Sequence, residues 1–313
     1  MTITQLEYVV AVDTYRNFAL AASKVFVTQP TLSMQIKKME EELDVVIFDR
    51  SKKPVIPTPI GEEVIAQARK ILKEFQKVHD LIDDQQEIVT GELRVGIIPT
   101  LSPYLLPGFA PSFLKKYPEV VISVEELLTD QILHHLNNDL LDVGILVTPI
   151  KGGNFTEIPM FYEQFKLYLG KDHPLLASDK IQAGELSLSE MWLLQEGHCF
   201  RNQMINLCTE DALEDADRKL KFESGSLETL KRLVDKQGGY TLLPELAIRE
   251  LSSKEKMRIR SFEEPQPVRE VSLVIHRSFL KRKLIDLLQK EIIDCLPKDV
   301  FDKEDKSIVE WAA

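Results

Sequence analysis

Residues 18–43 read FALAASKVFVTQPTLSMQIKKMEEEL, and this stretch predicts two helices that are joined by a tight turn. The turn ends at Thr28, which is a favourable N-cap, and Pro30 fits the first turn of the helix that follows. Apolar residues of this second helix share one face at helical spacing: Leu32, Ile36 and Met39. The polar side chains near its N-terminus therefore face outward, which is typical of a helix that enters the major groove of DNA.

The flanking residues extend this DNA-binding hypothesis. Residues 44–57 look like a short β-wing with a basic tip, which suits contact with phosphate or the minor groove, and a solvated hairpin is the alternative. The net charge is −11, yet residues 17–39 and 50–61 contain basic side chains and no acid. DNA binding needs a basic face rather than a basic protein, with scattered surface charge as the competing interpretation. The candidate DNA-contacting residues are Thr28, Gln29, Pro30, Thr31, Ser33, Gln35, Lys37, Lys38, Arg50, Lys52 and Lys53.

One long helix is predicted after the wing, over residues 58–87. Thr58 and Pro59 supply a cap and a first-turn proline. The apolar residues then alternate in steps of three and four, as in a coiled-coil seam: Ile60, Val64, Ile65, Ala68, Ile71, Leu72, Phe75, Val78, Leu81 and Ile82. This narrow stripe predicts a homodimer, which two-fold DNA half-sites also require. The alternative is a helix that packs on its own domain.

Beyond residue 90 the pattern changes to strands that alternate with helices, which predicts a mostly parallel sheet. Strands are expected at residues 93–98, 120–125, 142–147, 158–162, 166–169, 220–223 and 270–276, with a further strand after Gly239. Helices are expected at residues 104–117, 130–138, 187–191, 201–213, 226–236 and 280–293. Two crossings, near residues 163–165 and 264–268, divide this region into two subdomains. A ligand or a reactive site is expected in the crevice between them.

The predicted organisation has three parts. Residues 1–57 form an all-α, winged helix-turn-helix DNA-binding domain, and residues 58–90 form a linker helix that dimerises. The remainder is an α/β regulatory domain of two Rossmann-like subdomains. Residues 91–163 and 268–300 form the first subdomain, and residues 164–267 form the second, which contains two cysteines.

Bulk properties exclude several classes of protein. In this chain of 313 residues the longest apolar runs are too short to cross a bilayer and the first residues show no secretory signal, so we expect a cytoplasmic protein. Three cysteines are too few for a secreted disulfide scaffold. We interpret Cys295 as a packing residue, and His134 and His135 lack further ligands at the spacing of a metal site. We expect no metal and no cofactor.

The sequence resembles the LysR-type transcriptional regulators along nearly its whole length. Residues 18–33 and 36–50 carry this resemblance in the helix-turn-helix region, and GGYTLLP at residues 238–244 carries it in the second subdomain. The TPIG at residues 58–61 departs slightly from the family's Thr-x-Ala-Gly. The resemblance implies a winged helix-turn-helix, a linker helix and a periplasmic-binding-protein-like regulatory domain. It also implies a tetramer that binds double-stranded DNA and works with RNA polymerase, and it implies no enzymatic activity.

Within this family, GHCFRNQ at residues 197–203, with Cys208 after it, is similar to the members that sense hydrogen peroxide and activate oxidative-stress genes. This similarity implies that Cys199 is the peroxidatic cysteine and that Cys208 is the resolving cysteine. It also implies that Thr100, Thr129 and His198 help to hold peroxide. The family's arginine near the last strand maps to Arg269.

The chemistry of such a site makes two demands on the protein. Peroxide reacts with a thiolate, so the sensing cysteine needs a lowered pKa and access to solvent, and neighbouring donors and an arginine favour that state. The resulting sulfenic acid is converted to a disulfide by a second thiol. Cys199 and Cys208 are nine positions apart, so an intact helix holds them about 13.5 Å apart, whereas a disulfide needs Cα atoms within about 7 Å. Oxidation therefore has to refold this segment, which then repacks the subdomains and rotates the DNA-binding domains.

Two other hypotheses compete with peroxide sensing. In the first, the protein is a regulator of the same family that binds a small metabolite in the crevice, and its cysteines are ordinary buried residues. Replacing Cys199 with serine abolishes the response only under peroxide sensing. The second alternative is a thiol peroxidase, which leaves the helix-turn-helix without a role.

Overall fold

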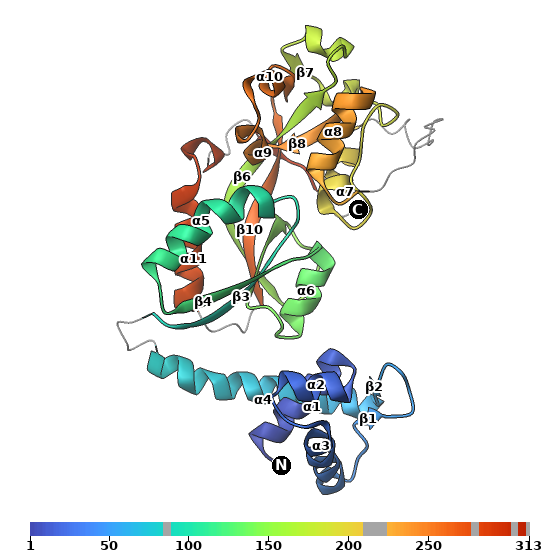
Figure 1. Ribbon diagram of the computed structural model, residues 1–313, viewed down its shortest axis with the longest axis vertical. Helices are drawn as coiled ribbons and strands as arrows, with labels where there is room; N and C mark the ends of the chain where they lie inside the picture. Colours follow the sequence, from blue (N-terminus) through green and yellow to red (C-terminus); the bar gives the residue numbers. More distant parts are fainter. Residues whose placement is uncertain (84–88, 209–223, 277–281, 302–305, 311–313) are drawn as a thin grey trace. The chain divides into compact units, whose positions relative to one another are not determined.

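The computed structural model describes residues 1–83, 89–208, 224–276, 282–301 and 306–310 (Figure 1). The chain divides into two compact units, unit 1 (Met1–Glu87) and unit 2 (Ile88–Ala313). Within the described ranges, none of the helices has both the length and the apolar composition of a membrane span.

Unit 1 contains the helix-turn-helix and a small wing. Its elements are α1 (Ile3–Tyr15), α2 (Phe18–Lys24), α3 (Gln29–Leu43), β1 (Phe48–Asp49), β2 (Ile56–Pro57) and α4 (Pro59–Asp83). The Thr28 hydroxyl caps α3 by accepting a hydrogen bond from the Thr31 amide, as predicted. The three predicted core residues of α3, which are Leu32, Ile36 and Met39, are fully buried. The wing is only two residue pairs long, with Phe48 opposite Pro57 and Asp49 opposite Ile56.

A close approach of two backbones fixes α4 against the wing. The Thr58 hydroxyl donates to the Val46 carbonyl at 2.6 Å and accepts from the Gly61 amide at 3.0 Å. A Cβ added at Gly61 would lie 2.0 Å from the Ile47 carbonyl oxygen. Because real Cβ atoms do not approach an oxygen so closely, only glycine permits this start of α4.

The predicted seam of α4 divides into two parts. Ile65 and Ala68 are buried in the core of unit 1, so the alternative of a helix that packs on its own domain accounts for this part. Ile60, Phe75 and Val78 remain 44%, 45% and 57% exposed. The side chains of Leu81 and Ile82 lie outside the described residues.

Unit 2 is built around a sheet with the strand order β4-β3-β5-β10-β6-β9-β7, with β11 beside β10 and β8 beside β6. The strands are β3 (Gly91–Ile97), β4 (Val120–Glu126), β5 (Val143–Thr148), β6 (Phe155–Leu169), β7 (Lys180–Ile181), β8 (Tyr240–Pro244), β9 (Ile259–Phe262), β10 (Gln266–His276) and β11 (Lys306–Ile308). The helices are α5 (Ser102–Lys116), α6 (Thr129–Asn137), α7 (Cys199–Asn206), α8 (Leu227–Gln237), α9 (Glu245–Arg249), α10 (Ser253–Lys256) and α11 (Arg282–Cys295).

Two long strands, β6 and β10, run through both halves of unit 2 (Figure 1). They are antiparallel to each other, from Val268 opposite Gln164 to His276 opposite Phe155. On β6, Phe161 belongs to one hydrophobic cluster and Phe165 to a second cluster, which we call the cores of subdomain I and subdomain II. β6 therefore passes from one core to the other between Phe161 and Phe165.

These crossing strands also correct two predictions. The expected strands at 158–162 and 166–169 are one continuous strand, because β6 passes from one core to the other without a break. The sheet is mixed rather than mostly parallel, because β10 pairs antiparallel with both β5 and β6. The parallel pattern holds for β3, which lies between β4 and β5.

The helix predicted at residues 187–191 is wrong. The Tyr240 hydroxyl accepts from the Ser187 amide at 2.6 Å and donates to its carbonyl at 2.7 Å, and the same carbonyl accepts from the Glu190 amide at 3.2 Å, so residues 187–190 form a turn that is fixed to Tyr240. Met191 instead forms a bridge with Tyr240. The strand predicted at 220–223 and the end of the helix predicted at 201–213 lie outside the described residues. Cys295 is exposed, which contradicts its interpretation as a packing residue, although its sulfur lies near Gly108.

Candidate functional site

Cys199 lies at the boundary between the two subdomains. It is the first residue of α7, and His198 precedes it as the N-cap. The Cys199 side chain belongs to the core of subdomain I, whereas the next residue, Phe200, belongs to the core of subdomain II. Only 4% of Cys199 is exposed. The thiol is therefore enclosed where the two cores meet.

A buried ion pair lies at the same boundary. Arg269 on β10 faces Glu163 on β6 in the sheet register. The Arg269 Nε and Nη2 atoms lie 2.8 and 2.7 Å from Glu163 Oε2, and neither side chain is more than 1% exposed. Glu163 Oε1 also accepts from the Leu246 amide at 2.9 Å. This carboxylate carries no local sequence signal, so it is absent from the predicted site residues.

Arg269 connects the ion pair to the predicted peroxide site. Its Nη1 donates to the Thr100 hydroxyl at 2.8 Å, and its Nη2 donates to the Thr100 carbonyl at 3.1 Å. The guanidinium carbon lies 5.0 Å from the centre of the Phe200 ring. The structure therefore brings together Thr100, Cys199 and Arg269 from three segments that are far apart in the sequence.

The electrostatic state of the thiol differs from the sequence-based expectation. Burial raises the pKa of Cys199, while Arg269, the Thr129 side chain and the amides at the start of α7 act in the opposite direction. The balance leaves the pKa above its ordinary value, so the expectation of a lowered pKa and a solvent-accessible thiol is wrong for this state. The physical reason is that a dry site disfavours the thiolate and that Glu163 offsets the charge of Arg269.

Thr129 and His198 contribute two more polar side chains. The Thr129 side chain, at the start of α6, hydrogen-bonds to the Cys199 thiol, and His198 Nε2 is buried without a hydrogen bond to any described residue. Burial lowers the pKa of His198, and the Glu126 carboxylate acts against this effect. A buried polar atom without a partner costs free energy, so His198 Nε2 suits a small polar molecule. An open cleft of about 390 Å³ borders His198, Glu126 and Gln131.

Cys208 is not close to Cys199 in the described state. It follows the end of α7, its thiol donates to the Met204 carbonyl at 3.4 Å, and it packs on the core of subdomain II. Burial raises the pKa of Cys208 to about 11. All three cysteines are free thiols, and α7 separates the first two as the helical spacing predicts.

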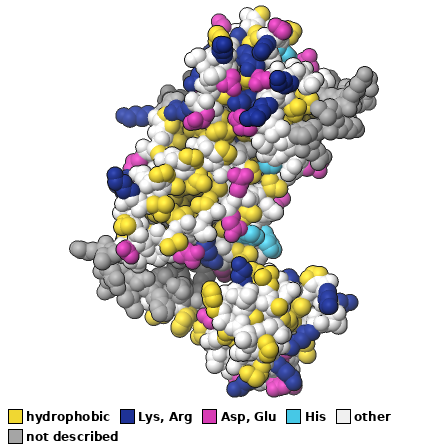
Figure 2. All heavy atoms as spheres, in the orientation of Figure 1, with side chains coloured by type: hydrophobic (Ala, Val, Ile, Leu, Met, Phe, Trp, Pro, Cys, Tyr) yellow, Lys and Arg dark blue, Asp and Glu magenta, His cyan; other side chains and the backbone are white. Residues whose placement is uncertain are grey.

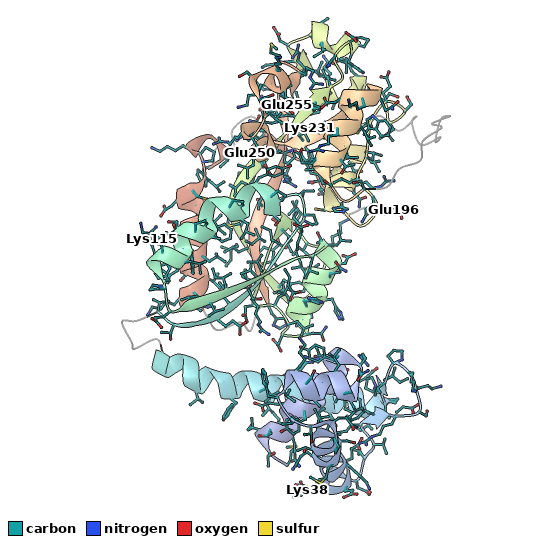
Figure 3. The ribbon with its side chains drawn as sticks, viewed as in Figure 1. Lys38, Lys115, Glu196, Lys231, Glu250 and Glu255 are labelled. Atoms are coloured by element: carbon teal, nitrogen blue, oxygen red, sulfur yellow. The ribbon has the colours of Figure 1, made fainter. Side chains whose placement is uncertain are left out.

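The candidate DNA-binding face belongs to unit 1. Lysine and arginine side chains are visible over α3 and the wing in Figure 2, and Figure 3 labels Lys38 on α3. Most of the predicted residues are exposed: Thr28, Gln29, Pro30, Thr31, Lys37, Lys38, Lys52 and Lys53. Ser33 and Arg50 are joined by a 3.1 Å hydrogen bond, and Arg50 also binds Glu40. Gln35 accepts from Gln5 at 3.3 Å, so these contacts would have to rearrange for base recognition.

One residue of this face was missed because it is apolar. Met34 lies on α3 and is 61% exposed, among polar and basic neighbours. Its position three residues after Thr31 and four before Lys38 places all three on one side of the helix. An exposed apolar side chain on a groove-facing helix can contact the methyl group of thymine. The helical spacing of Leu32 and Ile36 marks the buried face of α3 in the sequence, and Met34 lies off that face.

A metal centre has no candidate in the described ranges, which contain no group of three or more His, Cys, Asp or Glu side chains that could hold a metal ion. His134 and His135 are neighbours on α6 with ring centres 6.1 Å apart.

Family models match both units. Residues 3–62 match the model described as "Bacterial regulatory helix-turn-helix protein, lysR family". Residues 86–292 match the "LysR substrate binding domain".

Individual relatives and solved structures are also similar. The chain is 35% identical over 275 residues to a "Hydrogen peroxide-inducible genes activator" of Haemophilus influenzae, which covers 88% of this chain and 90% of the relative. A full-length OxyR variant from Pseudomonas aeruginosa matches with a TM-score of 0.79 and 33% identity, over 95% of this chain and 99% of that one. A Corynebacterium glutamicum OxyR mutant with hydrogen peroxide bound matches with a TM-score of 0.61 and 27% identity, over 94% and 92% of the two chains.

Proposed function

Because the chain belongs to the LysR family of bacterial transcriptional regulators, we propose that it senses hydrogen peroxide at Cys199 and responds by changing how it holds DNA. The observation that carries this proposal is the convergence of Cys199, Thr129 and Arg269 with Thr100 in one buried site, where His198 precedes the thiol in the chain. Relatives that are named for peroxide-inducible genes, and a similar structure with peroxide bound, support it.

The first chemical step oxidises Cys199. The Cys199 sulfur attacks one oxygen of peroxide, the S–O bond forms as the O–O bond breaks, and the product is a sulfenic acid. The leaving oxygen takes the proton of the thiol and departs as water. The Thr129 hydroxyl beside the thiol and the His198 Nε2 atom hold peroxide, and the guanidinium of Arg269 stabilises the charge that develops on the leaving oxygen.

The second step joins Cys199 to Cys208. The Cys208 sulfur attacks the sulfenic sulfur, the S–O bond breaks, and water leaves. This step requires α7 to unwind, because the helix holds the two residues at opposite ends. Residues 199–208 therefore have two mutually exclusive structures, a helix with free thiols and an unwound segment with a disulfide. A change between them can alter the packing of the rest of unit 2.

DNA binding is proposed for α3 and the wing. The exposed residues of α3 contact the major groove, and Lys52 and Lys53 contact phosphate or the minor groove. We propose a dimer through the exposed apolar residues of α4, such as Ile60 and Val78, and a tetramer as the working assembly. RNA polymerase is the proposed partner during activation.

The test of this function is mass mapping of the cysteines after reduced protein meets a few equivalents of peroxide, together with a DNA footprint. A Cys199–Cys208 disulfide that changes the footprint supports the proposal, and Cys199→Ser should abolish both changes. Cys295→Ser is the matched control and should leave both changes intact. If both thiols stay free and the footprint is unchanged, the proposal fails and a metabolite in the cleft becomes the better hypothesis.

A further inference from the structure

A short strand at residues 306–308 pairs with the first residues of β10. β11 lies parallel to the start of β10, with Lys306 opposite Gln266 and Ile308 opposite Val268. The Val309 amide continues this pairing with a 2.8 Å bond to the Val268 carbonyl. These residues lie beyond residue 292, where the match to the regulatory-domain model ends. The family match therefore gives no role for these residues, and their contacts in this chain are the basis for one.

The same strand is held by two side chains of α7. Gln203 Nε2 donates to the Val309 carbonyl at 2.7 Å, and Asn206 Nδ2 donates to the Glu310 carbonyl at 2.8 Å. Gln203 is fully buried, whereas Asn206 is exposed. The two residues are three positions apart, so they lie on one side of the helix and reach successive carbonyls of the strand.

Both bonds depend on the helical form of α7. Gln203 and Asn206 can reach the neighbouring carbonyls of residues 309 and 310 together only while residues 203–206 are helical. Unwinding would change both the distance between the two side chains and their directions. The segment that joins Cys199 to Cys208 includes both residues. A disulfide between the cysteines is therefore incompatible with the pair of contacts to Val309 and Glu310.

We propose that residues 306–310 act as a clasp on α7, and that Gln203 and Asn206 are positioning residues that hold the helix in its thiol form. The inference rests on the proposed disulfide between Cys199 and Cys208. When the Cys208 sulfur displaces water from the sulfenic sulfur, α7 unwinds and the clasp is released. The C-terminal strand thereby becomes a second element that reports the redox state.

Thermodynamic linkage makes this coupling reciprocal. If oxidation weakens the clasp, then loss of the clasp must favour oxidation by the same factor. One hydrogen bond of ordinary strength corresponds to about fivefold in an equilibrium constant, so two bonds correspond to about thirtyfold. The clasp therefore shifts the equilibrium toward the thiol form, so α7 unwinds only under more oxidising conditions.

The experiment uses the full chain with Asn206→Ala, and Asn206→Gln as the matched control. Glutamine keeps an amide donor at this position of α7, so the control retains a group that can bond to the Glu310 carbonyl. A chain that ends at residue 305 removes the clasp, and a chain that ends at residue 310 is its control. Two quantities are measured: hydrogen exchange of the amides of residues 306–310, and the ratio of disulfide to thiol in a glutathione redox buffer.

In reduced wild-type protein the amides among residues 306–309 that bond to β10, Val309 among them, should be protected, and oxidation should abolish this protection. Asn206→Ala should raise their exchange in the reduced protein and should increase the disulfide-to-thiol ratio about fivefold. Truncation after residue 305 should increase this ratio about thirtyfold. Both control proteins should behave as the wild type.

The outcomes separate this inference from the proposed function. A disulfide that forms while residues 306–309 stay protected overturns the clasp and leaves peroxide sensing intact. Failure of the disulfide to form in any variant overturns the proposed switch and, with it, the release of the clasp. Unchanged exchange in reduced Asn206→Ala overturns the clasp whatever the cysteines do.

Discussion

Replacing Glu163 with glutamine should make Cys199 react faster with peroxide. Arg269 is the charged group that most strongly favours the Cys199 thiolate, and Glu163 lies within 2.8 Å of it in a fully buried pair. The carboxylate therefore offsets the positive charge that the thiol would otherwise experience. Glutamine keeps the shape of Glu163 and an oxygen that accepts from the Leu246 amide, but it removes the charge.

The size of the effect follows from two opposing factors. An opposite charge beside an acid favours its ionised form by about tenfold or more, so exposing the thiol to an unpaired Arg269 should raise the thiolate population about tenfold. A more acidic thiol is a weaker nucleophile, and this loss amounts to about threefold for the same change. The net rate of sulfenic acid formation at neutral pH should therefore rise about threefold.

The assay isolates the first chemical step. Cys208→Ser and Cys295→Ser remove the other thiols, and the sulfenic acid on Cys199 is trapped with dimedone and counted by mass spectrometry between pH 6 and 10. Glu163→Gln should move the pH–rate profile toward lower pH. Glu163→Asp keeps the charge and is the matched control, with a profile that should stay close to that of the parent.

Loss of one partner from a buried ion pair is destabilising by roughly 3–5 kcal/mol, so folding is checked by circular dichroism before the rates are compared. A folded Glu163→Gln protein with an unmoved pH–rate profile would refute the reasoning. That result would mean that Arg269 does not act on the thiol through its charge. Its role would then be limited to its hydrogen bonds with Thr100.

Three further predictions follow from other contacts. Gly61→Ala should destabilise unit 1 by roughly 1–3 kcal/mol in chemical denaturation, because its Cβ would meet the Ile47 carbonyl, whereas the Cβ of Gly108→Ala would meet only the Cys295 side chain, with the sulfur at 3.4 Å, so this variant is the control for adding a Cβ at a glycine. Alkylation of Cys208 in folded protein with serine at positions 199 and 295 should rise about tenfold per pH unit up to pH 10, because burial raises its pKa to about 11 and ionisation comes late; levelling near pH 9 would contradict the described burial. In a duplex selected from a random pool, exchanging thymine for uracil at a contacted base should lower the affinity of the wild-type protein roughly fourfold. Met34→Ala should abolish this loss, and equal losses in both proteins would exclude Met34 from recognition of the methyl group.

Local periodicity was sufficient to predict the DNA-binding unit. Leu32, Ile36 and Met39 recur at helical spacing, and all three are fully buried. Thr28 and Pro30 fixed the start of the same helix, because capping depends on residues that are neighbours in the sequence. The residues that the helix presents outward then follow from the same spacing, except that Met34 was overlooked because it is not polar.

The regulatory site could be predicted only in part, because its contacts are long-range. Arg269 pairs with Glu163 across 106 positions and with Thr100 across 169 positions. Such pairs depend on the register of strands, which leaves no periodic signal in the sequence. The helix expected at residues 187–191 failed for the same reason, since a distant residue, Tyr240, bonds to the backbone of Ser187 and forms a bridge with Met191.

The placement of the two cysteines explains how a change of one bond could alter the whole of unit 2. Cys199 packs in the core of subdomain I, and Cys208 packs on the core of subdomain II. Under the proposed mechanism the disulfide brings these sulfurs to bonding distance, so at least one of them must leave its core. Close-packed cores respond to such a loss by repacking rather than by leaving a void, since an unfilled cavity is costly. Because β6 contributes side chains to both cores and pairs with β10, the repacking is transmitted along these two strands.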